Sequence, residues 1–504
     1  MNRYVNKIIP MIRYIVILTL SFLSLSLEAQ EKNVKLTLSQ VIGIASQSSI
    51  DAFKQKNMYF SSYWAFKYYK ANKLPSLAIG SNPLSYSNSI RQDYDYVQHT
   101  WIYSGQNNLT SNASLKMAQI VGLTGGSFNV SSDLGMTRNF IGDQQTMYSA
   151  NALSVGYTQR VNGYNSMHWA SKIEPVKFEL AKKNLIQSME NIALTATSKF
   201  FAMIDAQIEI NISLTNLANA DTLFQLGKGR YQVGTVTQDE LLNLELTQMN
   251  AKLAVTRANQ GLVRARADLN SYLALEKGTI VECILPSAVS ALQVDVDEAV
   301  QKALENNPAM LSERQRLLDE DNKVAQTKAQ NGLSVDISAS AGINQKAYAI
   351  SDAYQNPNKF QNLGIVGLTI PILDWGRRKG AVLMAKSNRE VVRSSIKQEL
   401  IDFQQSVLMN VMEFNLQSEQ VMNSARADTI ARMGYDVTMR RFKIGKLDVT
   451  KLNLARNDVE TARRAYIASM RRYWNDYFTI RQLTLFDFEK KTDLTIDFDK
   501  IPTE

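Results

Sequence analysis

The side chains that usually serve as nucleophiles or metal ligands are too few here to build a catalytic centre. The 504 residues include one cysteine, Cys283, and two histidines, His99 and His168. A metal cluster or a Cys–His pair needs several such residues close together, and a single cysteine cannot form an intrachain disulfide. No phosphate-binding loop, His-Glu-x-x-His or Gly-x-Ser-x-Gly motif occurs. We therefore predict no catalytic residue, no metal and no cofactor, and we expect that the protein is not an enzyme.

The sequence instead repeats itself. Residues 230–234 and 441–445, which read Arg-Tyr-Gln-Val-Gly and Arg-Phe-Lys-Ile-Gly, lie 211 residues apart. The same spacing relates two joins between a β-like stretch and a long polar helix, one beginning near Val155 and the other within residues 364–380. Self-similarity at a fixed spacing indicates an internal duplication. Each unit is predicted to be a helix, a strand region, a long helix, a glycine turn and another helix.

The strand regions have the alternation of a sheet with two different faces. Between Ser334 and Ile343, apolar residues alternate without exception with serine, aspartate or glycine. Such strands of about ten residues suit a membrane β-barrel, although a half-solvated sheet in a soluble protein has the same pattern. An open sheet cannot lie in lipid with unpaired edges. The membrane interpretation therefore requires several copies of the chain to close the sheet.

The long helices, predicted at about 166–226 and 377–433, would each be on the order of 90 Å long. After the first glycine turn, apolar residues from Leu241 to Tyr272 recur in alternating steps of three and four, which indicates a coiled-coil seam. A second seam consists of Leu242, Leu246, Met249 and Leu253. Two seams on one helix predict neighbours on two sides, as in a wall or tube of helices.

The chain begins with a basic segment, an apolar run and small residues, which is typical of a secretory signal peptide. The net charge of +9 is spread among acids along the helices, so nucleic acid is not an expected partner. The predicted divisions are the signal peptide at 1–29, the first repeat at 30–276, a link at 277–296, the second repeat at 297–486 and a charged, loosely packed tail at 487–504. The strand regions are expected at about 76–160 and 334–371, and the tip turns at 227–235 and 440–446. An insertion at about 84–111 is expected to be an exposed loop or a plug-like excursion.

The order and spacing of these features resemble the TolC family of outer-membrane efflux proteins, the outer membrane factors. The resemblance covers about residues 36–486. It rests on the two repeats, on the proline-ended strand that runs into Asp-Trp-Gly-Arg-Arg at 374–378, and on the paired glycine turns. It implies an α+β membrane protein, in which a homotrimeric transmembrane β-barrel, with about four strands from each chain, joins a long periplasmic α-helical barrel. The implied location is the outer membrane of a Gram-negative bacterium.

The resemblance also implies a function and partners. The protein would be a channel-tunnel, the passive exit duct of a tripartite efflux pump or a type I secretion system. Its partners would be two other copies, outer-membrane lipid, a periplasmic adaptor protein, and an inner-membrane pump or ABC exporter. The alternative is a periplasmic or surface coiled-coil scaffold without a pore. The sequence does not distinguish the export of drugs, metals or polypeptides.

The resemblance assigns roles to residues at the two glycine turns. Tyr231, Gly234, Phe442 and Gly445 match the turns that meet the adaptor in the family, although the glycines would also serve simply to end helices. Family members narrow the pore with charged residues soon after the glycine, which here are Asp239, Glu240, Asp448 and Lys451. Lys451 stands where the family has an acid, so it would pair with Glu240 to lock the tip or weaken cation preference. These charges would otherwise be ordinary solvated surface residues.

Overall fold

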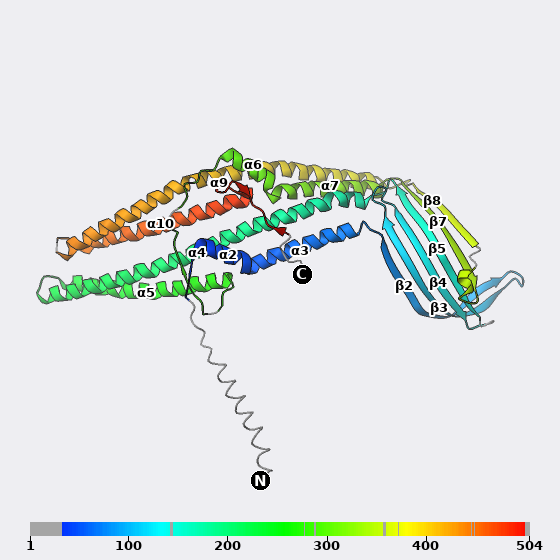
Figure 1. Ribbon diagram of the computed structural model, residues 1–504, viewed down its shortest axis with the longest axis horizontal. Helices are drawn as coiled ribbons and strands as arrows, with labels where there is room; N and C mark the ends of the chain where they lie inside the picture. The colour runs from blue at the N-terminus through cyan, green and yellow to red at the C-terminus, as the bar shows by residue number, and fades with distance from the viewer. Residues whose placement is uncertain are drawn as a thin grey trace, which may run out of the picture.

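The computed structural model of the protein is elongated, with a long helical body and a β-sheet at one end (Figure 1). It describes residues 33–141, 145–276, 278–286, 289–355, 359–370, 372–444, 446–447 and 449–498. The helices are α2 (Leu38–Ser48), α3 (Ile50–Ala71), α4 (Ser166–Gln232), α5 (Gln238–Tyr272), α6 (Val296–Asn306), α7 (Pro308–Asn331), α8 (Asp352–Gln355), α9 (Arg377–Lys443) and α10 (Val449–Thr484). The short strands are β1 (Asn33–Leu36), β6 (Ile280–Cys283), β9 (Phe486–Asp487) and β10 (Thr492–Asp493).

The main sheet has six strands in the order β2-β3-β4-β5-β7-β8, and every neighbouring pair is antiparallel. Its strands are β2 (Ser76–Asp95), β3 (Thr100–Ile120), β4 (Ser127–Asn139), β5 (Thr146–Val161), β7 (Ser334–Ala347) and β8 (Lys359–Thr369). The expected number of about four strands is therefore too low. Residues 84–111 were expected to be a loop or a plug, but most of them pair in the β2–β3 hairpin. Cross-strand pairing supplies the hydrogen-bond partners of their backbone groups, and the polar composition of the segment gives no sign of that pairing.

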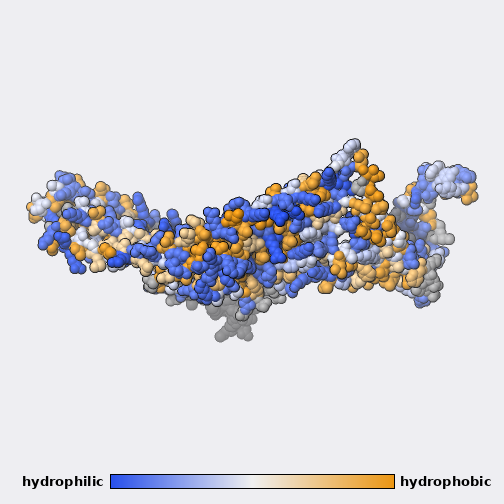
Figure 2. Space-filling view, turned by 90° about the horizontal axis from the view of Figure 1, so that it is seen from above, coloured by the Kyte–Doolittle hydropathy of each residue, from blue (hydrophilic) through white to orange (hydrophobic). Residues whose placement is uncertain are grey.

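The sheet has one apolar face and one polar face. On one face, the successive cross-strand partners are Leu77, Met117, Val130, Val155 and Ala341. Ile337 lies on the same face of β7 as Ala341 and pairs with Val366. Many of these side chains are open to the surroundings, with Leu77 69% and Val366 72% exposed. Figure 2 shows hydrophobic side chains gathered at this end of the molecule. On the opposite face, Arg160 forms an ion pair with Asp336 at 2.7 Å.

Two long helical hairpins form the other end of the body, α4 with α5 and α9 with α10, and Figure 1 shows them separating toward their tips. The α4 and α9 helices run to Gln232 and Lys443, beyond the predicted ends near residues 226 and 433. The glycines near the predicted ends, Gly227, Gly229 and Gly434, lie within the helices and do not stop them. At Gly227 an added Cβ would collide with the side chain of Leu244 on α5.

The α2 and α3 helices meet at Ser49, which ends the first helix and caps the second. The Ser49 hydroxyl accepts a hydrogen bond from the Ala52 amide at 3.1 Å. Thr37 begins α2 with a capping box, in which its hydroxyl accepts from the Gln40 amide and the Gln40 side chain accepts from the Thr37 amide. These caps replace backbone hydrogen bonds that the first turns of the helices lack.

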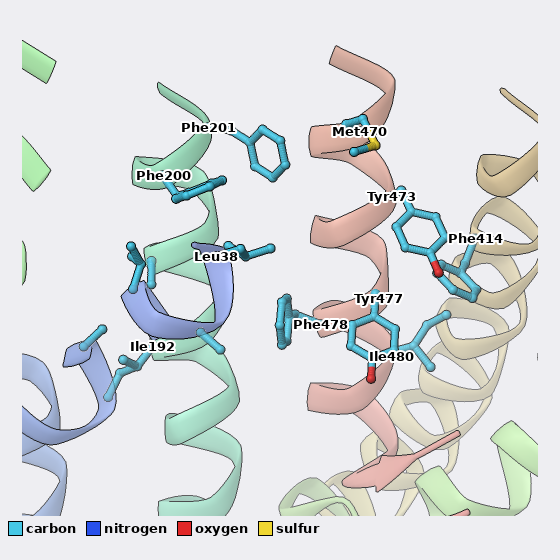
Figure 3. Close-up of a cluster of buried hydrophobic side chains, with 14 of the residues drawn as sticks. Leu38, Ile192, Phe200, Phe201, Phe414, Met470, Tyr473, Tyr477, Phe478 and Ile480 are labelled. Carbon is cyan, nitrogen blue, oxygen red and sulfur yellow. The ribbon is translucent and has the colours of Figure 1, made fainter. Parts of the chain in front are cut away.

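The main hydrophobic core lies midway along the body, where α2, α4, α9 and α10 meet (Figure 3). The α10 helix stands in the middle of this core. Its Tyr473 and Tyr477 point toward Phe414 of α9, and its Phe478 points toward the side of α2 and α4 (Figure 3). Phe200 and Phe201 of α4 are completely buried. This core therefore joins the first repeat to the second.

The link and the tail are more ordered than predicted. Strand β6 of the link pairs in parallel with β1, and the expected loose tail begins with the buried residues Asp487 and Phe488. Arg481 forms ion pairs with Asp487 at 2.9 Å and with Glu190 of α4 at 2.8 Å. Burial lowers the pKa of Arg481, but its hydrogen bonds to Glu190 raise the pKa above its ordinary value. Long-range pairing of this kind leaves no local signal in the sequence.

We predict that Asp476→Asn stabilises the helical body at alkaline pH. Burial, together with the charge of Glu413, raises the pKa of Asp476 to about 6, despite Arg472 and a hydrogen bond from Gln417. Because this folded pKa exceeds the unfolded value of about 3.9, the wild-type protein loses stability as the pH rises through about 6. The variant should melt at a higher temperature than the wild type at pH 8, and the difference should shrink toward pH 4.

The control is Asp458→Asn on the same helix. It also removes one negative charge, but from an exposed position. Melting of the detergent-purified protein would be followed by circular dichroism. A gain for Asp476→Asn that is equal at pH 8 and pH 4 would contradict the assignment.

Candidate functional site at the helical tips

Both long hairpins reverse direction through the same hydrogen-bonded turn. The Thr235 amide donates to the Arg230 carbonyl at 2.9 Å, and the Lys446 amide donates to the Arg441 carbonyl at 3.0 Å. Gly234 has a φ of +73°, which glycine adopts without strain. The duplication therefore preserves the turn down to individual backbone contacts. Gly445 and Asp448 of the second turn lie outside the described residues.

The two aromatic residues of the turns differ in accessibility. The side chain of Tyr231 is 42% exposed, whereas that of Phe442 is only 7% exposed. Both were expected to meet an adaptor protein. Within one chain, only Tyr231 presents its ring to a partner, and Phe442 packs inside its own hairpin.

The acids after the first turn lie at the N-terminus of α5. The Glu240 carboxylate accepts a hydrogen bond from the Thr237 amide at 3.1 Å, and the Thr237 hydroxyl accepts from the Glu240 amide at 3.4 Å. A hydrogen bond from Thr237 and one from its own backbone amide lower the pKa of the neighbouring Asp239. Glu240 is thus engaged in capping its helix, which competes with the expected pairing to Lys451. Lys451 is exposed in the first turn of α10, at the position equivalent to Glu240.

A ladder of polar contacts joins α4 of the first hairpin to α10 of the second. Asp205 pairs with Arg471 at 3.0 Å, and Glu209 pairs with Arg464 at 2.6 Å. Closer to the tip the contacts become hydrogen bonds, with the Asn216 amide donating to Glu460 at 2.7 Å. These side chains hold the first repeat against the second along the part of the body that leads to the tips.

The last contacts before the hairpins separate surround a cavity of about 360 Å³ between α4, α9 and α10. On one side the Asn219 amide donates to the Tyr435 hydroxyl at 2.8 Å. On another side the buried Asp428 carboxylate pairs with Arg432 and, at 3.2 Å, with Arg463. The space allows the helices to shift, and the polar contacts resist that shift. The sequence did not single out these residues, because polar side chains along a long helix look the same as solvated ones.

No constellation of the kind that binds a metal is present among the described residues. The candidate site lies at the helical tips. It consists of two turns, charged helix starts, and the contacts that hold the hairpins together.

Solved structures of several outer-membrane proteins share this fold. The chain is similar to the CmeC outer membrane channel of Campylobacter jejuni, with a TM-score of 0.63, 13% identity, and coverage of 92% of this chain and 88% of that one. It is similar to the outer membrane protein VceC of Vibrio cholerae, with a TM-score of 0.60, 11% identity and coverage of 91% and 96%. It is also similar to the MtrE outer membrane channel of Neisseria gonorrhoeae, with a TM-score of 0.59, 12% identity, and coverage of 91% of each chain. At these identities the likeness establishes the fold. No curated protein matches the sequence.

The second repeat also matches a family model. Residues 299–484 match the model described as outer membrane efflux protein. This match lies within the second of the two repeats and leaves the first repeat unmatched. Among the described helices, none has both the length and the apolar character needed to cross a membrane.

We predict opposite effects for the same substitution at two glycines of the first tip. Gly234→Ala places a Cβ at positive φ and should destabilise the turn by about 1–2 kcal/mol. Gly229→Ala lies inside α4, where alanine should stabilise the helix by about 0.5–1 kcal/mol. At both positions an added Cβ meets open space, so collisions do not explain a difference. Hydrogen exchange of the tip amides should speed up in the first variant and slow down in the second, and equal rates would contradict the role given to Gly234.

Proposed function

We propose that three copies of this chain form one continuous duct, which is the passive exit of a tripartite efflux pump or a type I secretion system. The observation that carries the proposal is the open six-stranded sheet with an apolar outer face. Strands β2 and β8 are its edges, and each has one side without a pairing strand. Unpaired backbone groups in hydrocarbon cost several kcal/mol each, so the sheet must close.

The directions of the edge strands support closure by copies arranged in a ring. Strand β2 leads away from the helices and β8 leads back to them, so β8 of one copy and β2 of the next would be antiparallel, like every other pair in the sheet. Such a head-to-tail contact makes a ring when the rotation closes. Three copies would give a barrel of eighteen strands rather than twelve. Because barrel diameter grows with strand number, its lumen would be wider than the four-strand expectation implied.

The helical body supports the same arrangement. The first seam of α5 packs on α4 and buries Ala258 and Leu269, while the second seam stays open, with Leu242, Leu246 and Leu253 about equally exposed at 56–57%. The α9 helix, at the other side of the body, also exposes a row of large apolar side chains, among them Met384, Val391, Ile401, Met412 and Met433. Exposed apolar surfaces of this extent indicate contacts with another protein surface. Neighbouring copies would cover them.

A passive role fits the polar inner face of the sheet and the mechanical character of the tips. Energy would come from an inner-membrane pump or ABC exporter, reached through a periplasmic adaptor. Tyr231 and Gly234 of the first turn, with Phe442 and Gly445 of the second, would form the adaptor contact. Because Phe442 is buried, it would support the second turn while Tyr231 supplies the ring that the adaptor meets.

The charged residues after the turns would form the pore constriction. Asp239 and Glu240 come from the first hairpin, and Asp448 and Lys451 from the second. Repeated by three copies, they would give rings of acid with a basic ring nearby, and rings of charge set ion selectivity in pores. The sign of the selectivity depends on whether the acids or Lys451 dominate.

The test is a planar bilayer experiment on the detergent-purified protein, with its mass in detergent measured in parallel. A trimer that gives discrete current steps of uniform size is the expected result, and the reversal potential in a salt gradient reports the ion selectivity. A protein that stays monomeric, or that gives no steps even when its tip contacts are removed, would overturn the duct.

We predict that Tyr435→Phe raises the open probability of the channel. The variant loses the hydrogen bond between Asn219 and Tyr435, one of the last contacts before the hairpins separate. A hydrogen bond of this kind contributes about 1 kcal/mol, so the ratio of open to closed states should rise about fivefold. Tyr466→Phe on α10 serves as the matched control and should leave the currents unchanged. Equal currents in Tyr435→Phe and the wild type would contradict a holding role for this contact.

A further inference from the structure

The β2–β3 hairpin extends well beyond the rest of the sheet. Strand β4 pairs with β3 only as far as Asn108, which faces Asn139. From there to the turn, the two strands of the hairpin pair only with each other, ending at Asp95 opposite Thr100. Figure 1 shows the hairpin projecting at the end of the molecule opposite the helical tips. In the membrane orientation of the family, this end lies outside the cell.

The projecting part keeps an apolar face that continues the apolar face of the sheet. A register shift between Asn82 and Ser85 moves the side chains of β2 by one place, so Tyr86, Ile90 and Tyr94 lie on the same side as Leu77. Their partners across the hairpin include Trp101 opposite Tyr94 and Tyr103 opposite Gln92. The other face is mainly serine, aspartate and threonine, with Ile102 as its one large apolar residue, while the paired Asn88 and Asn107 interrupt the apolar face. The bulge therefore prevents the apolar residues from turning to the polar side.

Phe140 and Ile141, which follow β4, cover part of this apolar face: the Phe140 ring lies 6.5 Å from that of Tyr86, and the Ile141 side chain lies 3.1 Å from the place that a Cβ on Gly105 would take. The part nearer the turn stays open among the described residues. Ile90 is 77% exposed, Tyr103 74% and Trp101 60%. A lone two-stranded hairpin is marginally stable in water. An aromatic face on such a hairpin indicates that another surface packs against it.

The stagger of the sheet identifies what lies next to the hairpin in a closed barrel. Paired residues lead straight across the sheet from Ser76, at the start of β2, to Leu363 of β8, by way of Ala118, Asn129, Gly156 and Ser340. This line of partners starts at the first residue of β2 but reaches β8 six residues before Thr369, where β8 ends. Carried one strand further, the same stagger puts Leu363 beside about residue 83 of the next copy. Phe360 would then lie near Tyr86 of that copy, and the β7–β8 loop beside the projecting hairpin.

The β7–β8 loop is chemically suited to this neighbour. Tyr348 is 71% exposed and Ile350 54%, and Phe360 lies on the apolar face with 75% of its surface exposed. The α8 helix in this loop is anchored to its own sheet by the buried Ala353 and by a 2.7 Å hydrogen bond from Gln345 to the Asp352 carbonyl. The loop therefore presents apolar side chains from a fixed base.

We propose that the apolar face of the β2–β3 hairpin docks on Tyr348, Ile350 and Phe360 of the adjacent copy, as a clasp between copies outside the membrane. This inference rests on the proposed trimer. The clasp adds a contact beyond the seam between β8 and β2. Strand β8 begins at Lys359, so it is too short to pair with the upper half of β2. Each copy would hold the next one, and three clasps would fasten the rim of the channel.

The experiment is disulfide cross-linking of the full-length protein in intact cells. Tyr348→Cys is combined in turn with Ile90→Cys, Tyr94→Cys or Tyr103→Cys on the apolar face, and with Ser89→Cys or Asp93→Cys on the polar face as matched controls. The natural Cys283 is buried, and burial raises the pKa of its thiol to about 12, so it does not react. Strands β2 and β8 lie at opposite edges of one sheet, so a link between these positions joins two copies.

We expect at least fivefold more cross-linked chains, up to trimers, from the apolar-face pairs than from the polar-face pairs, with none from single-cysteine variants. Equal linking from both faces, or no linking in a protein that is trimeric in detergent, would overturn the clasp and leave the duct intact. Apolar-face cysteines that are shielded from a soluble maleimide yet do not cross-link would also overturn it, since envelope lipid or saccharide would then cover the face. A protein that is monomeric in detergent would instead overturn the proposed function.

A second measurement tests the stability of the trimer. Tyr94→Ser with Tyr103→Ser should lower the temperature at which the trimer dissociates in SDS, whereas Ser87→Ala with Gln106→Ala on the polar face should not. Unchanged dissociation of a folded Tyr94→Ser, Tyr103→Ser trimer would contradict the clasp.

Discussion

The backbone of the six-stranded sheet imposes the condition on which the rest of the molecule depends. In hydrocarbon, every amide and carbonyl group needs a hydrogen-bond partner, and a single chain leaves one side of β2 and one side of β8 without one. The opposite directions of these edges allow copies to join head to tail with the same antiparallel pairing that exists within the chain. The apolar outer face, the polar inner face and the uncovered seams on α5 and α9 are all consistent with that single requirement.

Stability is distributed along the body in a way that suits a duct that opens at one end. Midway along, aromatic side chains from α4, α9 and α10 form a buried core, and Arg481 is held between Glu190 and Asp487. A charge buried this way is costly to separate from its partners, so this region should stay fixed. Toward the tips the contacts between the repeats become isolated ion pairs and hydrogen bonds beside a cavity. Contacts that are partly hydrated contribute less each, which makes the tips the part that can move.

The sheet end of the molecule departs from the simple duplicated plan. The first repeat contributes four strands and the second contributes two, and the additional strands include the longest hairpin of the sheet. The sequence indicated an insertion here but not its structure. Residues 84–111 mix tyrosine with serine, asparagine and aspartate, and they contain a bulge that interrupts the alternation after Asn82. A pattern of period two that changes phase part-way along a strand has no continuous signal, so the segment resembles a loop until its pairing partner is known.

The sequence by itself determined the duplicated architecture of this protein. The spacing of 211 residues, the alternation from Ser334 to Ile343 and the two seams after the first glycine turn predicted the repeats, the two-faced sheet and the wall of helices, because hydrophobic period is a local property. The tip turns could also be predicted from local sequence, because the positive φ at Gly234 favours glycine. Only the tertiary structure decided the number of strands, the burial of Phe442, the pairing of β1 with β6, and the contacts of Asn219, Tyr435 and Asp428. Each of these depends on residues far apart in the chain, and whether a polar side chain faces water or a partner is fixed by what packs against it rather than by its neighbours in sequence.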